Sequence, residues 1–191
     1  MAEHTIRTAF VTGAAGFIGS HIVASLVEGG VQVRALVRDG SVQQPAANAL
    51  AQDNVELIVG DLLAPDGWRD RLRGSDTLFH VAALYSARPA DAPNLYRVNV
   101  DGTQAVCQVA AAVGVQRVVH TSTIGVIGRP AGGALANEDT PFNLWRGASD
   151  YVRSKWLGEA AALLWYRRGL PVVVVCPTAP IGSGDYKPTA T

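Results

Sequence analysis

The sequence carries no excess of charge of either sign. Its 191 residues include 16 lysines and arginines against 16 aspartates and glutamates, which gives a formal net charge of zero. Proteins that bind nucleic acid mainly through its phosphate backbone need a basic surface, so we expect no nucleic-acid partner. A pocket for a single nucleotide remains compatible with this balance, because such a pocket needs no positive charge over the whole molecule.

Cysteine is scarce, and the histidines are scattered. The two cysteines are Cys107, within a helical pattern, and Cys176, at the end of an apolar strand pattern. We interpret both as buried thiols of a reducing compartment, because two cysteines do not make a disulfide framework. The histidines show no spacing typical of metal ligands, so we expect no metal site. These histidines are His4, His21, His80 and His120.

Long hydrophobic runs are missing as well. The apolar segment 172–176 has the length of a strand and falls far short of a membrane span. The polar residues 1–7 have neither the basic start nor the apolar stretch of a signal peptide. Together these absences predict a cytoplasmic protein with no membrane span.

Hydrophobic residues make up 48% of the chain, and their spacing switches between the periods of strands and helices. An apolar stripe from Ile18 to Val27, ended by Gly29 and Gly30, predicts the first helix. Further helices are predicted over residues 94–113 and 150–168. Six short strands are predicted, over residues 8–12, 31–37, 55–59, 77–82, 116–121 and 171–176.

Strands that alternate with helices indicate right-handed βαβ crossovers and a parallel sheet covered on both faces. We therefore predict one α/β domain over residues 1–191, a doubly wound parallel sheet (Rossmann fold) in three layers with strand order 3-2-1-4-5-6. Two polar stretches, 38–50 and 128–149, are predicted loops. The second is longer than an ordinary connection, so we expect it to be functional.

The run 12–19, Thr-Gly-Ala-Ala-Gly-Phe-Ile-Gly, joins the first predicted strand to the first helix. Its glycines at 13, 16 and 19 lack a Cβ, so the backbone can turn tightly and approach a phosphate closely. The free N–H groups of the following helix then face the anion. This arrangement is typical of a site for a dinucleotide pyrophosphate, although a tight turn without a ligand remains an alternative.

The second motif is Tyr151-x-x-x-Lys155 in the last predicted helix. Positions i and i+4 lie on one helix face, and a neighbouring ammonium favours the phenolate. We therefore expect Lys155 to lower the pKa of Tyr151 and make it a proton donor and acceptor. A chance pair on a surface helix is the alternative interpretation, because such spacing is common.

Motifs occur in order along the chain: the glycine run, then Asp61-Leu62, 80–83 (His-Val-Ala-Ala), 121–123 (Thr-Ser-Thr) and the Tyr-Lys pair. Most fall where predicted strands end, at the edge where open α/β sheets bind ligands. This pattern resembles the extended short-chain dehydrogenase/reductase superfamily, also called the NAD-dependent epimerase/dehydratase family, over essentially the whole chain. Val37-Arg38-Asp39 is similar to dihydroflavonol-reductase-like members. The segments 177–182 and 185–189 resemble the hopanoid-associated sugar epimerase branch.

The resemblance implies roles for individual residues. Tyr151 would be the acid/base, Lys155 its electrostatic partner, and Thr123 the hydroxyl that hydrogen-bonds the substrate oxygen, with Ser122 as the alternative by a shift of one residue. Local capping of the strand end is a further alternative for these hydroxyls. The residues implied to bind the cofactor are Gly13, Gly16, Phe17, Ile18, Gly19, Arg38, Asp61, Leu62, Val81, Ala82, Ala83, Thr121, Tyr151, Lys155 and Pro177.

The cofactor preference depends on the end of the second strand. NAD-selective members of the dinucleotide fold place an acid there to accept from the ribose 2′-hydroxyl. Here Val37 and Arg38 stand at this point, and Arg38 can pair with a 2′-phosphate. We therefore prefer NADP over NAD. Two alternatives stay open: a shift of one residue would place Asp39 at the ribose, and Arg38 can be a solvated loop charge.

The resemblance also implies a function. We expect an NAD(P)-dependent oxidoreductase domain that transfers a hydride between NADP(H) and a carbonyl or hydroxyl carbon of a small-molecule substrate. The alternatives are an NAD-dependent nucleotide-sugar epimerase/dehydratase and a non-catalytic dinucleotide-binding module. Tyr85, Ser86 and the 128–149 loop are expected to approach the substrate. Members of the superfamily are longer, so we expect the substrate-binding region to be missing and the apolar surface left exposed to favour a homodimer.

Overall fold

The structure, a computed structural model, describes residues 5–40 and 50–185. His4, most of the predicted loop 38–50 and residues 186–189 of the late motif lie outside the described residues. Within the described part, no helix is long and apolar enough to cross a membrane.

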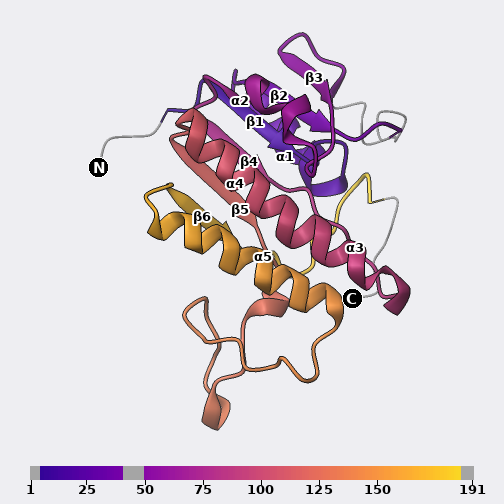
Figure 1. Cartoon of the computed structure of the whole chain (residues 1–191), viewed down its shortest axis with the longest axis vertical. Helices are drawn as coiled ribbons and strands as arrows, with labels where there is room; N and C mark the ends of the chain where they lie inside the picture. Colours follow the sequence, from indigo (N-terminus) through magenta and orange to yellow (C-terminus); the bar gives the residue numbers. More distant parts are fainter. Residues whose placement is uncertain (1–4, 41–49, 186–191) are drawn as a thin grey trace.

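Six parallel strands form one sheet, in the order β3-β2-β1-β4-β5-β6. This is the predicted order, and it places the first strand in the middle of the sheet (Figure 1). Every ladder between neighbours is parallel, as the predicted crossovers require. The strands are β1 (Thr8–Thr12), β2 (Gln32–Val37), β3 (Val55–Val59), β4 (Thr77–His80), β5 (Arg117–Thr121) and β6 (Val172–Val175).

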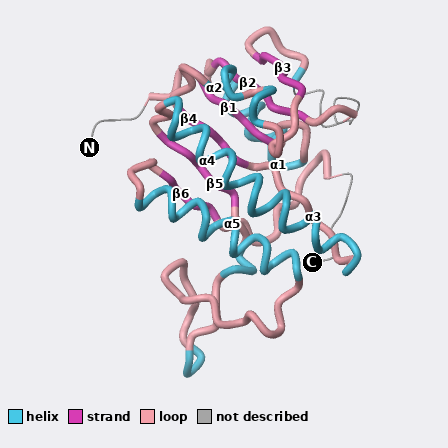
Figure 2. Tube along the Cα trace, viewed as in Figure 1, coloured by secondary structure: helices cyan, strands magenta, loops and turns pink. Residues whose placement is uncertain are grey.

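The sheet has a hydrophobic core on each face, because successive side chains of a strand point to opposite sides. In β1, Phe10 packs in the core beneath α4 (Gly102–Val113) and α5 (Asp150–Arg167), whereas Val11 packs in the core beneath α1 (Phe17–Glu28). Helices α4 and α5 lie side by side on their face (Figure 1; Figure 2 shows the same arrangement by element type). The three-layer prediction is confirmed.

The predicted helix 94–113 consists of three pieces. The short helix α3 (Ala92–Tyr96) runs into a π-helical segment (Arg97–Asp101) and then into α4. A π turn accommodates one extra residue and is frequent at functional sites. Here it contains Asn99, whose side chain is buried.

Strand β4 ends at His80, two residues before the predicted end at Ala82. The backbone N–H groups of Val81 and Ala82 both donate to the side-chain oxygen of Thr12, each at 3.2 Å. These two N–H groups thus bond to a side-chain hydroxyl, whereas in a longer strand they would bond to backbone carbonyls of the neighbouring strand. The exchange ties the chain after β4 to the last residue of β1.

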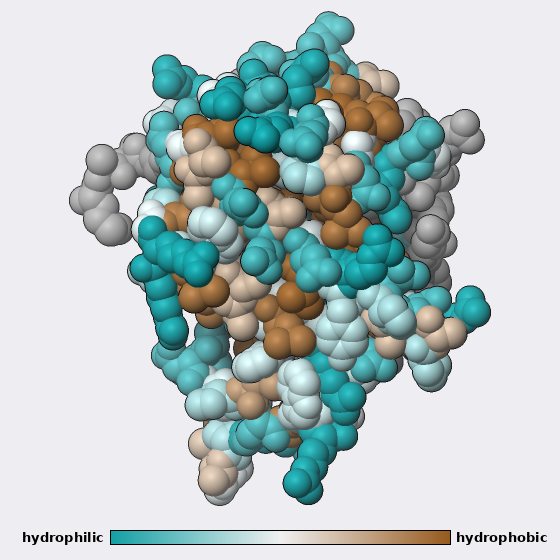
Figure 3. All heavy atoms as spheres, viewed as in Figure 1, coloured by the Kyte–Doolittle hydropathy of each residue, from teal (hydrophilic) through white to brown (hydrophobic). Residues whose placement is uncertain are grey.

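Apolar side chains remain exposed on one side of the edge strand β6. Val172 packs in the core beneath α4 and α5, whereas Val173 and Val175 point to the opposite side and are 46% and 39% exposed. The view in Figure 3 shows a mainly hydrophilic surface with separate hydrophobic patches. The described residues thus leave part of one sheet face open.

Candidate functional site

The glycine run forms a closely packed turn between β1 and α1. Gly13 has a φ of +69°, and a Cβ added there would lie 2.7 Å from the backbone nitrogen and Cα of Ala82. A Cβ on Gly19 would collide with the carbonyl oxygen of Gly13. The Gly16 N–H donates to that same carbonyl at 2.9 Å. The turn therefore needs glycine at 13 for its backbone angle and at 19 for close approach.

The start of α1 suits an anion. Gly16 is the N-cap, no side chain caps the helix, and the first turn contains no acidic residue. The first N–H groups of a helix have no partner within the helix, and they carry its partial positive charge. Phe17 and Ile18 stand in this first turn and are partly buried. A pyrophosphate fits this site, because the first N–H groups of α1 can donate to it and the glycines of the turn have no side chains to block its approach.

A second predicted group lies where β2 and β3 end. Arg38, Asp39, Val59, Gly60 and Asp61 line one hollow of about 330 Å³. The structure thus brings three predicted or considered cofactor residues, Arg38, Asp39 and Asp61, around one space. The Asp61 carboxylate accepts from the Leu63 N–H at 2.9 Å, and its carbonyl accepts from the Trp68 indole at 2.8 Å.

Leu62 lies apart from this hollow. Its side chain is 8% exposed and packs in the core with Trp68 and Leu72. Its side chain is therefore not among those that line the hollow. The chain after β4 behaves differently: Val81 and Ala82 are partly buried, and Ala83 is exposed.

Hydrogen bonds below this segment fix the protonation of His80. Thr12 accepts from two N–H groups, so its own proton is directed to Nδ1 of His80, 2.8 Å away. Thr103 donates to the Asn99 carbonyl at 2.7 Å and therefore accepts from Nε2 of His80 at 2.9 Å. His80 is thus the neutral Nε2–H tautomer. Burial, together with the positive charge of Lys155, lowers its pKa to about 3.

Asn99 is a site residue that the sequence analysis missed. Its Oδ1 accepts from the Leu84 N–H at 2.8 Å, and its Nδ2 donates to the Leu84 carbonyl and to the Ser154 hydroxyl, both at 2.9 Å. The side chain therefore ties the segment after β4 to the helix that carries the Tyr-Lys pair. The signal available in the sequence was a polar residue inside an apolar helical stripe.

Lys155 is 4% exposed and lies beneath the end of β5. Its ammonium group donates to the Thr121 carbonyl at 2.7 Å. Burial lowers the pKa of Lys155 to about 8, against the opposing effects of Glu159 and Cys176. Thr121 is thus placed next to the lysine, with its backbone as the acceptor.

Tyr151 is partly buried, and its ring meets that of Tyr85 edge to face, with 4.8 Å between the ring centroids. Burial raises the pKa of Tyr151, and Tyr85 adds to the increase. The expected lowering by Lys155 is therefore wrong for the protein alone. The lysine donates to the Thr121 carbonyl, and the pKa of Tyr151 is raised by desolvation of its phenolate and by Tyr85.

The hydroxyls after β5 point in different directions. Ser122 is 5% exposed and donates to the carboxylate of Glu159 at 2.5 Å, beneath α5. Thr123 is partly buried, and its oxygen accepts from the Gly125 N–H at 3.3 Å, capping a short 3-10 turn (Ile124–Val126). The capping interpretation is therefore correct for the Thr123 oxygen, and among the described residues no hydrogen bond donated by its hydroxyl is found. Among the two, Thr123 is the better placed to meet a substrate.

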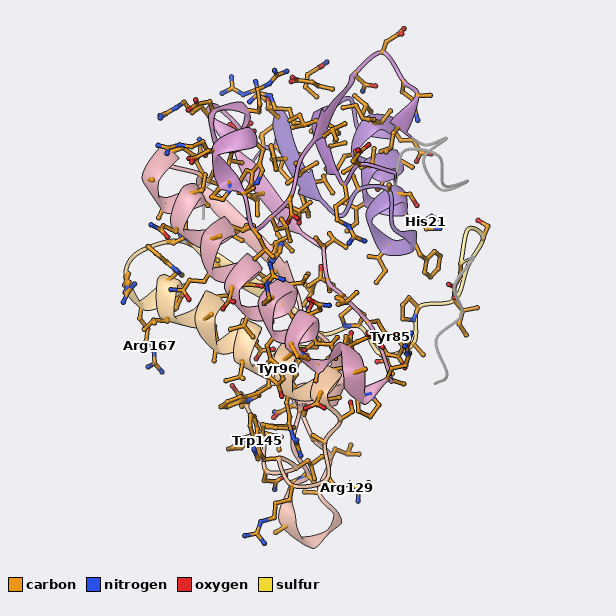
Figure 4. The ribbon with its side chains drawn as sticks, turned by 45° about the vertical axis from the view of Figure 1, so that its right-hand side comes forward. His21, Tyr85, Tyr96, Arg129, Trp145 and Arg167 are labelled. Atoms are coloured by element: carbon orange, nitrogen blue, oxygen red, sulfur yellow. The ribbon has the colours of Figure 1, made fainter. Side chains whose placement is uncertain are left out.

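The segment after β6 returns to the start of α1. The Pro177 carbonyl accepts from the Ile124 N–H at 3.0 Å, which fixes Pro177 beside the β5 end. Further on, the Ser183 carbonyl lies 2.8 Å from Nε2 of His21 in α1, and His21 stacks edge to face on Phe17. Figure 4 shows His21 and Tyr85 toward the same side of the molecule, where this segment passes.

The long loop 128–149 packs against α5 through aromatic rings. Phe142 stacks on Trp156 of α5 with 5.7 Å between ring centroids, and Trp145 meets Trp156 edge to face at 5.6 Å. Arg153 of α5 donates to the Trp145 carbonyl at 3.0 Å. Figure 4 shows Trp145 and Arg129 on this loop at the bottom of the molecule. The loop is thus anchored one turn from Tyr151. Among the described residues, no group of histidine, cysteine and acidic side chains could hold a metal ion.

Comparison with known proteins decides the family. The model of the NAD dependent epimerase/dehydratase family matches residues 9–191. The chain belongs to this family. Within curated proteins, it is 39% identical to sterol demethylase protein B of Methylococcus capsulatus, over 95% of this chain and 54% of that protein. It is 31% identical to dihydroflavonol 4-reductase of Zea mays, over 92% of this chain and 53% of that protein.

Solved structures of similar proteins share the fold. A short-chain dehydrogenase/reductase superfamily protein from Agrobacterium tumefaciens, crystallised with bound NAD, superimposes with a TM-score of 0.73. The two chains are 29% identical, and the match covers 89% of this chain and 48% of the other. The chain thus spans about half the length of the relatives it matches.

Proposed function

We propose that this chain is the dinucleotide-binding part of an oxidoreductase that transfers a hydride between NADP(H) and a carbonyl or hydroxyl carbon of a small molecule. The observation that carries the proposal is the arrangement along one edge of the sheet. The glycine turn at β1, the hollow at β2 and β3, and the Tyr-Lys pair beside β5 all follow the carboxyl ends of the strands. Open α/β sheets bind their ligands at this edge.

Named residues would hold the dinucleotide. The N–H groups at the start of α1 would bind the pyrophosphate, with Gly13 and Gly19 allowing its approach. The hollow beside Arg38 and Asp61 would take the adenosine end, and the segment 81–83 would line the cleft. Pro177 would pack near the nicotinamide. When bound, the nicotinamide supplies or accepts the hydride.

The proton chemistry falls to the chain's own side chains. Tyr151 would give its phenol proton to the substrate oxygen during reduction, and its raised pKa keeps that proton in place at neutral pH. Thr123 would orient the same oxygen by donating its hydroxyl proton, while its own oxygen accepts from the Gly125 N–H. Lys155 would stabilise the phenolate that forms, because its ammonium is positioned at the β5 end.

The position of Arg38 supports NADP. Arg38 is exposed at the hollow, where a guanidinium can bind a 2′-phosphate through two parallel hydrogen bonds. Asp39 lines the same hollow, and a carboxylate there favours the ribose hydroxyl of NAD. The Agrobacterium relative binds NAD. Comparison of both cofactors is therefore part of the test.

A second candidate is the epimerase function that gives the family its name. In that case the hydride taken from a nucleotide sugar would return to the opposite face of the same carbon. Tight retention of NAD through purification favours this candidate, whereas release of NADP favours reduction.

Fluorescence titration with NADPH and NADH tests binding on this chain. Turnover of ketones, aldehydes and nucleotide sugars is measured on the longest reading frame that contains it. We expect NADPH to bind and Tyr151→Phe to abolish turnover with little effect on binding. Tyr166→Phe, on the same helix but 57% exposed, is the matched control and stays active. Failure to bind either dinucleotide contradicts the proposal, and binding without turnover of any substrate class leaves only the non-catalytic module.

A further inference from the structure

Two consecutive residues at the end of β5 form hydrogen bonds with two residues of α5 that are one helical turn apart. The Thr121 carbonyl accepts from the Lys155 ammonium at 2.7 Å. The Ser122 hydroxyl donates to the Glu159 carboxylate at 2.5 Å. On an exposed helix, a lysine that precedes a glutamate by four residues is the weaker orientation for a pair. Here Ser122 holds the carboxylate, so the pairing does not depend on the helix alone.

Burial destabilises the charged form of Lys155. An ammonium group removed from water loses hydration, and it stays charged only where a negative group or hydrogen bonds compensate. The single hydrogen bond that the structure gives Lys155 is to a neutral carbonyl. The compensating charge must therefore come from its surroundings.

The titratable groups around Lys155 come from four elements. His80 of β4 and His120 of β5 are neutral at physiological pH, because burial lowers the pKa of each. Cys176, after β6, is a neutral thiol because burial raises its pKa. Tyr151 of α5 is a neutral phenol for the same reason. Within the described part of the chain, Glu159 is the carboxylate that raises the pKa of Lys155.

We propose that Glu159 is a positioning residue for Lys155: held by Ser122, its carboxylate supplies the counter-charge that keeps the buried ammonium charged beside Tyr151. The inference deepens the proposed function and rests on it for its role in turnover. Without this charge, desolvation favours the neutral amine, which cannot stabilise a phenolate. Glu159 itself acts only through Lys155 and needs no contact with substrate or dinucleotide.

The sequence offers a clean measurement, because it contains only two lysines, Lys155 and Lys187. Lysine labelled with ¹³C at Cε alone gives one side-chain signal for each, and a pH titration by NMR reports both midpoints. Lys187, outside the described residues, is the internal reference. The measurement uses the chain without a dinucleotide, so its result does not depend on whether the proposed function is correct.

We expect Glu159→Gln, which keeps an acceptor for Ser122 but removes the charge, to lower the Lys155 midpoint by about one pH unit. Glu159→Asp restores the charge and recovers part of the shift. Ser122→Ala lowers the midpoint by a smaller amount, because the carboxylate is no longer held. Glu28→Gln is the matched control and leaves both midpoints in place, since Glu28 is exposed at the end of α1.

An unchanged Lys155 midpoint in a folded Glu159→Gln protein overturns the proposal, with circular dichroism as the check on folding. If that variant does not fold, Ser122→Ala decides in the same way. In the longer enzyme, the alkaline limb of kcat against pH moves down in Glu159→Gln while the Km for substrate stays near its normal value. Equal pH profiles there contradict the role in turnover, whereas loss of all dinucleotide binding in the wild type contradicts the proposed function.

Discussion

The side-chain oxygen of Thr12 lies 2.8 Å from Nδ1 of His80, at the ends of the neighbouring strands β1 and β4. The same oxygen accepts from the N–H groups of Val81 and Ala82. One hydroxyl thus sets the tautomer of a buried histidine and the path of the chain that faces the glycine turn.

Replacing this hydroxyl tests its contribution to stability. Thr12→Val keeps the shape but leaves the two N–H groups and Nδ1 of His80 without a partner in a buried place. We expect the free energy of unfolding to fall by about 1–3 kcal/mol, measured by urea denaturation. Thr12→Ser keeps the hydroxyl and should lose much less. Equal stability of the valine variant and the wild type would show that water replaces the lost bonds.

The buried histidines predict a loss of stability in mild acid. The pKa of His80 is about 3 in the folded protein, below its ordinary value of 6.5, and burial lowers that of His120 too. Below pH 6.5 the unfolded chain therefore binds more protons, and stability falls as pH falls toward 3, by about 1.4 kcal/mol per pH unit for His80. His120 adds to this loss in the same direction.

Urea denaturation at pH 7.5, 6 and 5 measures this slope. His120→Gln should reduce it, because the variant has one fewer histidine to titrate. A free energy of unfolding that stays constant from pH 6.5 to pH 5 contradicts the assignment of neutral buried histidines.

Alanine at Gly13 tests the close approach of the glycine turn. The new methyl group would press on the backbone of Ala82, so we expect a loss of about 1–3 kcal/mol in stability and the loss of dinucleotide binding. Gly30→Ala is the matched control, because Gly30 has a similar φ of +76° with nothing within 4 Å of the added Cβ. The control should lose only the stability that corresponds to the backbone strain, and it should still bind the dinucleotide. Equal binding by both variants would locate the pyrophosphate elsewhere.

Arg38 tests the choice of cofactor. Arg38→Ala should weaken NADPH binding about tenfold and leave NADH binding almost unchanged, because only NADPH carries the 2′-phosphate. Arg88→Ala, another exposed arginine, is the control. Isothermal titration calorimetry gives both dissociation constants, and a parallel loss for the two cofactors would assign Arg38 a role at the shared part of the dinucleotide.

Much of the fold could be predicted because the local spacing of hydrophobic residues indicates where strands and helices lie. The six strands, α1 and α5 lie within a few residues of their predicted bounds, since buried parallel strands and amphipathic helices leave plain periodic patterns. The strand order was predicted from six strands that alternate with helices, and it is confirmed.

What the sequence could not reveal depends on contacts between distant segments. Asn99 forms hydrogen bonds with Leu84 and Ser154, and Glu159 accepts one from Ser122. No local sequence pattern predicts these pairs. The direction of the Tyr151 pKa was missed for a related reason. The spacing to Lys155 was visible in the sequence, but the burial of the phenol and the neighbouring Tyr85 ring were not.

The central place of β1 has a consequence for synthesis on the ribosome. This strand is made first, yet its two neighbours are β2 and β4, and the latter ends at His80. A growing chain therefore carries an unpaired strand edge and an open glycine turn until β4 has emerged, a period in which wrong pairing is easiest. An amino-terminal fusion that holds back residues 8–12 would split the sheet through its middle, whereas the same change at β6 would disturb only its margin.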